Sequence, residues 1–230
     1  MIKNLFVVAL GLLSATLLAT ASPAAAQGSA NQERVIEAAE ILDRMASEED
    51  AVPLRRTLKS AKALMIFPSV WKAAVVVGAE GGNGILMARD SDGVWSDPAF
   101  YTMGAGSIGF QIGVQDSEVL LAIMTDRGLD AIIANNFKLG VDASIALGTV
   151  GGGIGGATTT NFGGDIAVFT KNRGLFGGVS LEGAVVYERS DQEEEYFGSE
   201  FATARTIVIE RKFTNPDSAK LKATVAKHTQ

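Results

Sequence analysis

The residues that could carry out chemistry are few and poorly placed for it. The chain of 230 residues has no cysteine and one histidine, His228, close to its C-terminus. A cysteine nucleophile, a thiolate zinc site and a disulfide framework are therefore impossible, and one histidine cannot build a histidine-rich metal site. A cluster of acids lacks the alternating spacing and the glycine of a calcium loop; its members are Asp191, Glu193, Glu194 and Glu195. We expect these carboxylates and His228 to face water, and we expect no catalysis, no metal and no cofactor.

Two glycine motifs match the pattern GxGxxG, at residues 104–109 and 151–156. A dinucleotide site needs this motif between a strand and a helix. The first copy continues into a strand-like pattern, and the second continues into the turn-like segment ATTTNFGGD. Of the 26 glycines, 23 lie between Gly78 and Gly183. This concentration predicts strong curvature, bulges or close approach of another backbone. Either a packed helix or a ligand could lie against the small-residue face.

Two helices are predicted ahead of the glycine-rich region. From 31 to 49, apolar residues such as Val35 and Leu42 recur at helical spacing. Pro53 suits the first turn of a second helix, LRRTLKSAKALM, from 54 to 65. Its apolar side chains fall on one side, and the other side carries four bases: Arg55, Arg56, Lys59 and Lys62. This second segment is predicted to be a basic amphipathic helix.

The later part of the chain is predicted to form a sheet. Strict alternation in 107–115 and 137–148 predicts strands with one buried face. Further strands are indicated in VWSDPAFYTMG, EVLLAIMT, DIAVFT and LFGGVSLEGAVVYE, and one helix in 126–135. Asp142 and Glu182 are expected to be buried hydrogen-bond acceptors or ion-pair partners. The predicted fold class is α+β: a strongly curved, glycine-rich antiparallel sheet, barrel-like and mainly meandering, with an N-terminal helical lead and a few short helices.

The N-terminus resembles a secretory signal peptide. A lysine precedes an apolar stretch from Leu5 to Leu18, and small residues end at Ala26, which predicts cleavage before Gln27. The apolar stretch is short of the roughly 20 residues that span a bilayer. We therefore expect an exported, most simply periplasmic protein that can associate peripherally with a membrane. The expected division is a signal peptide at 1–26, an N-terminal helix at 27–50, a main domain at 51–215 and a C-terminal helix or tail at 216–230.

Charge is distributed unevenly along the chain. Residues 51–79 hold five bases and no acid, whereas residues 80–200 hold 17 acids and six bases. An acidic body does not suit nucleic-acid binding, but a basic segment can dock on an anionic membrane or an acidic protein. Near an anionic leaflet the four helix bases would contribute about 4 kcal/mol together, at about 1 kcal/mol each. Alternatively, the apolar side of this helix packs on the sheet and its bases simply face water.

Four long blocks of the sequence resemble the SYLF-domain (Ysc84-type) family of lipid-binding proteins. They are AKALMIFPSVWKAAVVVGAEGGNGILMARD, GVWSDPAFYTMGAGSIGFQIGVQ, FKLGVDASIALG and NRGLFGGVSLEGAVV, followed by YFG at 196–198. The resemblance runs from about Leu54 to Gly198 and marks 51–215 as a SYLF-like lipid-binding domain. The stretch GTVGGGIGGATTTNFGGD differs from the usual sequence of the family because it carries fewer charged residues.

The resemblance implies binding of anionic phospholipids, and of phosphoinositides in eukaryotic members, through bases of the helical lead. Some eukaryotic members also bind actin, an activity we do not transfer to an exported protein. The candidate lipid-binding residues are Arg55, Arg56, Lys59, Lys62, Lys72, Lys171 and Arg173. The predicted function is non-catalytic lipid binding in the bacterial envelope. The alternative is an envelope scaffold or adaptor whose basic helix meets an acidic protein partner.

Overall fold

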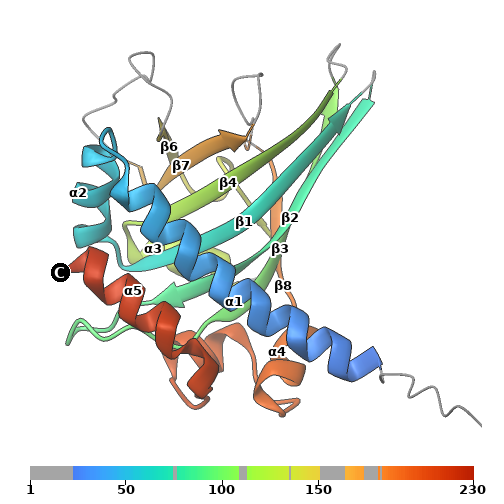
Figure 1. The fold of residues 1–230 in the computed structure, drawn as a ribbon, viewed down its shortest axis with the longest axis vertical. Coiled ribbons are helices and arrows are strands. Elements are labelled where there is room, and N and C mark those ends of the chain that lie inside the picture. The colour runs from blue at the N-terminus through green and yellow to red at the C-terminus, as the bar shows by residue number, and fades with distance from the viewer. Residues whose placement is uncertain are drawn as a thin grey trace, which may run out of the picture.

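A single curved sheet carries helices on both of its faces (Figure 1). The computed structural model describes residues 23–74, 77–108, 113–134, 136–150, 164–173, 181 and 183–230. The strands are β1 (Ala63–Ala74), β2 (Val77–Ala88), β3 (Ala99–Ile108), β4 (Gly113–Ile123), β5 (Phe137–Lys138), β6 (Ile145–Thr149), β7 (Ile166–Arg173) and β8 (Val185–Glu188). The helices are α1 (Pro23–Ser47), α2 (Val52–Ser60), α3 (Asp126–Ile133), α4 (Ser190–Phe197) and α5 (Ala219–Thr229), with a π-helix η2 (Arg205–Ile209) and a 3-10 helix η3 (Pro216–Ser218). No helix in these ranges is long and apolar enough to cross a lipid bilayer.

The sheet has the strand order β5-β8-β3-β2-β1-β4-β7-β6. Every described strand pair is antiparallel except β6 with β7. The outermost strands β5 and β6 follow one another in the chain and are joined by residues 139–144. Six residues span at most about 20 Å, so the sheet must curl until its two edges approach each other. The predicted α+β, barrel-like class is confirmed, although the order is not a simple meander because β4 pairs with β1.

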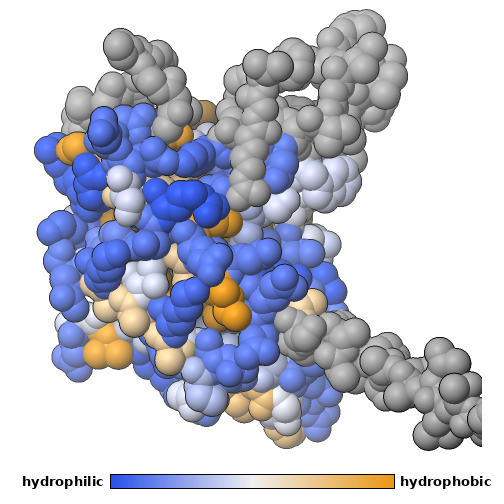
Figure 2. Space-filling model, in the orientation of Figure 1, coloured by the Kyte–Doolittle hydropathy of each residue, from blue (hydrophilic) through white to orange (hydrophobic). Residues whose placement is uncertain are grey.

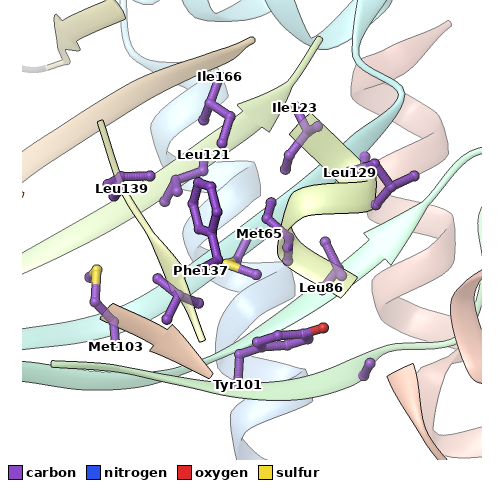
Figure 3. Close-up of a cluster of buried hydrophobic side chains, with 14 of the residues drawn as sticks. Met65, Leu86, Tyr101, Met103, Leu121, Ile123, Leu129, Phe137, Leu139 and Ile166 are labelled. Atoms are coloured by element: carbon purple, nitrogen blue, oxygen red, sulfur yellow. The ribbon is translucent and has the colours of Figure 1, made fainter. Parts of the chain in front are cut away.

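Each face of the sheet buries its own hydrophobic core, because strand side chains alternate between the faces. On the concave face, Met65, Leu121 and Ile123 pack with Leu129 of α3 and Phe137 of β5 (Figure 3). On the outer face, strand residues pack under α1, α2 and α5; this core includes Leu64, Ile66, Leu120, Leu42, Leu54, Leu58 and Leu221. Helix α3 therefore packs against the concave face of the sheet.

Some element boundaries differ from the prediction because the local hydrophobic pattern fits more than one structure. Helix α2 ends at Ser60, not at residue 65, and β1 begins at Ala63 opposite Ile123 of β4. Leu64 to Phe67 are buried on both faces of the sheet, so their apolar run does not distinguish strand from helix. The segment 107–115, predicted as one strand, is divided between two strands, since Ile108 ends β3 and Gly113 begins β4; residues 109–112 lie outside the described residues.

The predicted strand at 137–148 is also wrong, because a turn separates β5 from β6. Gly140 adopts a positive φ of 80° in this turn. Asp142 is exposed and accepts a hydrogen bond from the backbone N of Lys138 at 2.6 Å. It is therefore a turn residue and not a buried acceptor. Glu182 lies outside the described residues.

Two glycines of β2 accommodate an irregularity in β1. The β1 register shifts between Ile66 and Trp71, a segment that includes Pro68. A Cβ atom on Gly82 would lie 2.3 Å from the carbonyl oxygen of Ser69, and one on Gly84 would lie 2.5 Å from that of Ile66. Such contacts are prohibitive for a side chain, so the prediction of close backbone approach is confirmed here.

One acid of the 191–195 cluster lies in the interior. Glu193 is fully buried on α4 and accepts a hydrogen bond from the backbone N of Phe100 at 3.2 Å. Burial, followed by the neighbouring Glu188 carboxyl, raises the pKa of Glu193 to about 10. The expectation that the whole cluster is solvated is wrong for this residue. Between about pH 4.5 and 10 the folded state holds a proton that the unfolded state has lost, so stability falls as pH rises through this range.

His228 is part of a helix contact and not a solvated tail residue. It lies on α5, and its Nε2 is 2.8 Å from Oδ1 of Asp43 on α1. Lys227 contacts the same carboxylate at 2.6 Å. Hydrogen bonds from Lys227 and then His228 hold the pKa of Asp43 below its usual range. These contacts attach the C-terminal helix to α1.

Candidate functional site

Helix α2 presents two bases to solvent. Pro53 lies in its first turn, and Leu54 and Leu58 are buried in the outer-face core. On the opposite side, Arg56 and Lys59 are exposed. In the part of the chain that the structure describes, neither side chain has an acidic partner. Their exposure agrees with both alternatives from the sequence, docking on an anionic surface and simple solvation.

Arg55 has a structural role. Its Nη1 donates to the carbonyl oxygens of Ala46 at 2.9 Å and Glu48 at 2.8 Å. These acceptors lie at the end of α1, where helix carbonyls lack intrahelical partners. Arg55 is therefore half-buried and ties α2 to the end of α1, which makes its guanidinium less available to a ligand.

Lys62 is exposed but already paired. Its Nζ lies 2.5 Å from Oδ2 of Asp126, the first residue of α3. The side chains are 45% and 77% exposed, so the pair is solvated and can exchange partners. Sequence reasoning missed Asp126 because the two residues lie 64 positions apart. An anionic ligand would therefore have to compete with Asp126 for the ammonium group of Lys62.

Lys171 belongs to a charge network beneath the end of α1. Its Nζ pairs with Glu48, and it lies opposite Glu118 in the β4–β7 register. Glu118 is buried and pairs with Arg44 of α1 at 2.5 Å. The four alternating charges hold α1 on the sheet. The predicted ligand contact at Lys171 is therefore engaged in packing.

The two remaining candidates lie on β1 and β7, beyond the row of Glu118 and Lys171. Lys72 lies opposite Glu80 of β2 and Gln115 of β4. Arg173 ends β7 and lies opposite Asp116. Their side chains are outside the described set. Of the seven predicted residues, Arg56 and Lys59 are exposed on α2, whereas Arg55, Lys62 and Lys171 make contacts within the fold.

Arg89 is a base beside α2 that the sequence reasoning did not select. Its Nη1 lies 3.3 Å from the carbonyl oxygen of Lys59 and 3.4 Å from that of Thr229. It thereby joins α2 to the end of α5. Nothing in the sequence relates Arg89 to α2, since it follows β2 and reaches the helix only through the fold. Its guanidinium adds positive charge next to Lys59.

The burial of the apolar side of α2 limits how this surface can work. Leu54 and Leu58 are fully buried, so they cannot enter a headgroup region as an inserted amphipathic helix would. Two unpaired bases contribute about 2 kcal/mol near an anionic leaflet, half the value expected for four. The face crossed by α1 and α5 is mostly hydrophilic, with separate apolar spots (Figure 2). The surface suits weak, reversible electrostatic docking.

A second polar surface lies between α1 and α5. A groove of about 700 Å³ has acids such as Glu40 and Asp43 on one wall and bases such as Lys220 and Lys227 on the other. Ion pairs Lys220–Glu40 and Lys227–Asp43 cross it at 2.9 and 2.6 Å. Because its charges already satisfy one another, this groove is a helix–helix contact.

Within the described residues, no three acid or histidine side chains form a group that could hold a metal ion.

The fold and the site together define an α+β domain in which a packed, curved sheet presents exposed bases on an outer helix. A family model described as "Ysc84: Las17-binding protein actin regulator" matches residues 104–228. The chain belongs to this family, which confirms the resemblance seen in the sequence, and the match extends beyond Gly198 to include α5.

Curated relatives agree with this assignment. The human SH3 domain-containing YSC84-like protein 1 is 34% identical over 149 residues, which cover 64% of this chain and 43% of that protein. Its Xenopus laevis counterpart is 32% identical over 153 residues, or 66% and 45% of the two chains. The LAS seventeen-binding protein 3 of Saccharomyces cerevisiae is 31% identical over 157 residues, or 67% and 34%. The chain thus spans less than half the length of the curated relatives it matches.

Proposed function

We propose that this protein is a non-catalytic lipid-binding protein of the bacterial envelope that docks reversibly on anionic phospholipid. The export signal predicted at 1–26 would direct it to the periplasm, where it would associate peripherally with the membrane. The observation that carries the proposal is the exposure of Arg56 and Lys59 on α2 without acidic partners in the described structure. Phosphoinositide-type headgroups are the ligands that the family resemblance suggests, and any anionic phospholipid offers the same charge.

The relatives support a binding role in general terms. The names of the relatives described above refer to an SH3 domain and to binding of LAS seventeen, and none of these names refers to a reaction. The family description likewise speaks of a binding protein and regulator. Docking of about 2 kcal/mol through two bases is weak and is screened by salt. The protein would therefore exchange between the membrane and solution.

Liposome flotation with neutral and anionic vesicles tests the proposal. The wild-type chain should float with anionic vesicles at low salt and stay with the soluble fraction when the vesicles are neutral. The double variant Arg56→Glu and Lys59→Glu should lose this recovery. A matched control, Lys138→Glu and Arg205→Glu, makes the same charge change at exposed residues of β5 and η2, elements of the concave-face core. Equal recovery of both variants, or of the wild type on both vesicle types, would remove the proposal.

A protein partner is the second candidate function. The name LAS seventeen-binding protein 3 identifies a relative that binds another protein. In that case, the bases of α2 would meet an acidic surface of an envelope protein. Cross-linking in intact cells should then capture a partner that depends on Arg56 and Lys59, while vesicle binding should not respond to lipid charge.

A further inference from the structure

The two tryptophans of the chain occupy opposite environments. Trp95 is buried, and its Nε1 donates to Oγ1 of Thr229 at 3.0 Å. Trp71 lies on β1, and half of its surface (50%) is exposed. A large aromatic side chain on an open sheet face leaves a considerable apolar area in water. Trp71 therefore calls for a functional explanation, whereas Trp95 is part of the packing.

The surroundings of Trp71 leave its indole prominent. The ring lies beside Gly81 of β2, with Cζ2 3.7 Å and Cε2 3.9 Å from where a Cβ on that glycine would be. Gly81 pairs with Gly104 of β3, and a Cβ on Gly104 would meet nothing within 4 Å. Because these neighbours carry no side chains, one flank of the indole has no described side chain beside it. The glycines keep an accessible surface around the ring.

Trp71 lies on the same face of the sheet as α2. The register shift in β1 turns Val70 into the concave core, so Trp71 points to the outer face. Asp116 of β4 is its partner in the sheet, and the next charged row along this strand is Glu118 with Lys171. That row holds the C-terminal end of α1, after which the chain enters α2. Figure 1 shows β1 extending past α1, and none of the labelled helices covers this end of the strand.

We propose that Trp71 enters the interfacial region of the same anionic membrane on which Arg56 and Lys59 dock. Indole rings favour the headgroup level because they combine a large apolar body with one N–H donor. The helix bases supply attraction that salt screens, and the indole supplies apolar contact that salt does not screen. Contact at α2 and at the end of β1 would orient the outer face toward the bilayer. This inference rests on the proposed function and adds a second contact to it.

Intrinsic fluorescence gives a direct test, since Trp95 is buried and Trp71 is the exposed fluorophore. On binding to vesicles of mixed neutral and anionic phospholipid, the emission should shift to shorter wavelength. Phospholipids brominated near the glycerol end of their acyl chains should quench the tryptophan emission. Vesicle binding without a shift and without quenching would overturn the role of Trp71 and leave the α2 proposal intact. Absence of any vesicle binding would remove both.

Substitution provides the second measurement. Trp71→Ser should weaken partitioning into anionic vesicles at least tenfold, because burial of half an indole is lost. The matched control Val94→Ser removes an exposed apolar side chain, 57% exposed, from the loop between β2 and β3 at the other end of the sheet. It should bind like the wild type. Trp95 emission during thermal unfolding verifies that Trp71→Ser is folded. Equal partitioning of a folded Trp71→Ser and the wild type would refute the inference.

Discussion

Replacing Asp126 by asparagine should make the protein bind anionic membranes more tightly. Asp126 lies 2.5 Å from Lys62 and both side chains are largely solvated, so the pair contributes only about 0–1 kcal/mol to stability. Its carboxylate nevertheless cancels the charge of Lys62 next to α2. Near an anionic leaflet one unpaired base contributes about 1 kcal/mol, which corresponds to about fivefold tighter binding. Thr125, not Asp126, caps α3, so the helix should persist.

Cosedimentation with increasing amounts of anionic vesicles at low salt measures this gain. Asp130→Asn is the matched control, because it removes an exposed acid from the next turn of the same helix. Asp130→Asn should increase the affinity for anionic vesicles less than Asp126→Asn does. In a Lys62→Gln background, Asp126→Asn should lose most of its effect. The reasoning is refuted if Asp126→Asn binds no more tightly than the wild type, or if its gain persists without Lys62.

Three further variants test the structural assignments. Glu193→Gln should flatten the pH dependence of denaturant unfolding between pH 5 and 8, where the wild type loses at most about 1.4 kcal/mol of stability per pH unit; a wild-type profile without this decline would contradict the buried proton. Gly84→Ala should destabilise the fold by about 2 kcal/mol or more in thermal unfolding, whereas Gly106→Ala, with open space at its Cβ, should be far milder. Arg55→Met should cost about 1–3 kcal/mol of stability and leave vesicle binding of the folded protein unchanged. Weaker vesicle binding by folded Arg55→Met would instead make Arg55 a ligand contact.

Local periodicity was sufficient to predict much of the fold. The spacing of Val35 and Leu42 predicted the part of α1 from residue 31 onward, and the segment 126–135 contains α3. Glycine composition predicted close backbone contact, which the structure places at Gly82 and Gly84. These features depend on residues close together in the chain, within one helix or one hairpin. The local sequence pattern is therefore sufficient to predict them.

Other features depend on residues far apart in the chain. Alternation continues through 107–115 even though Ile108 ends β3 and Gly113 begins β4, since the ends of both strands have the same two-residue period. Glu193 resembles its solvated neighbours in sequence, and only the approach of Phe100 and Glu188 buries it. Likewise, no local pattern distinguishes Arg55, which binds the end of α1, from Arg56, which faces water. Assigning the bases of α2 required the fold.

The six-residue link between β5 and β6 affects how molecules of this protein meet one another. An open sheet ends in rows of unpaired N–H and C=O groups, which can template pairing with another chain and lead to aggregation. Here the outermost strands are short and are tied together, with Leu139 and Ala143 forming a bridge within the link. A strand from a second molecule therefore finds little space to add. Such protection would help a glycine-rich sheet without disulfides to stay monodisperse at high local concentration.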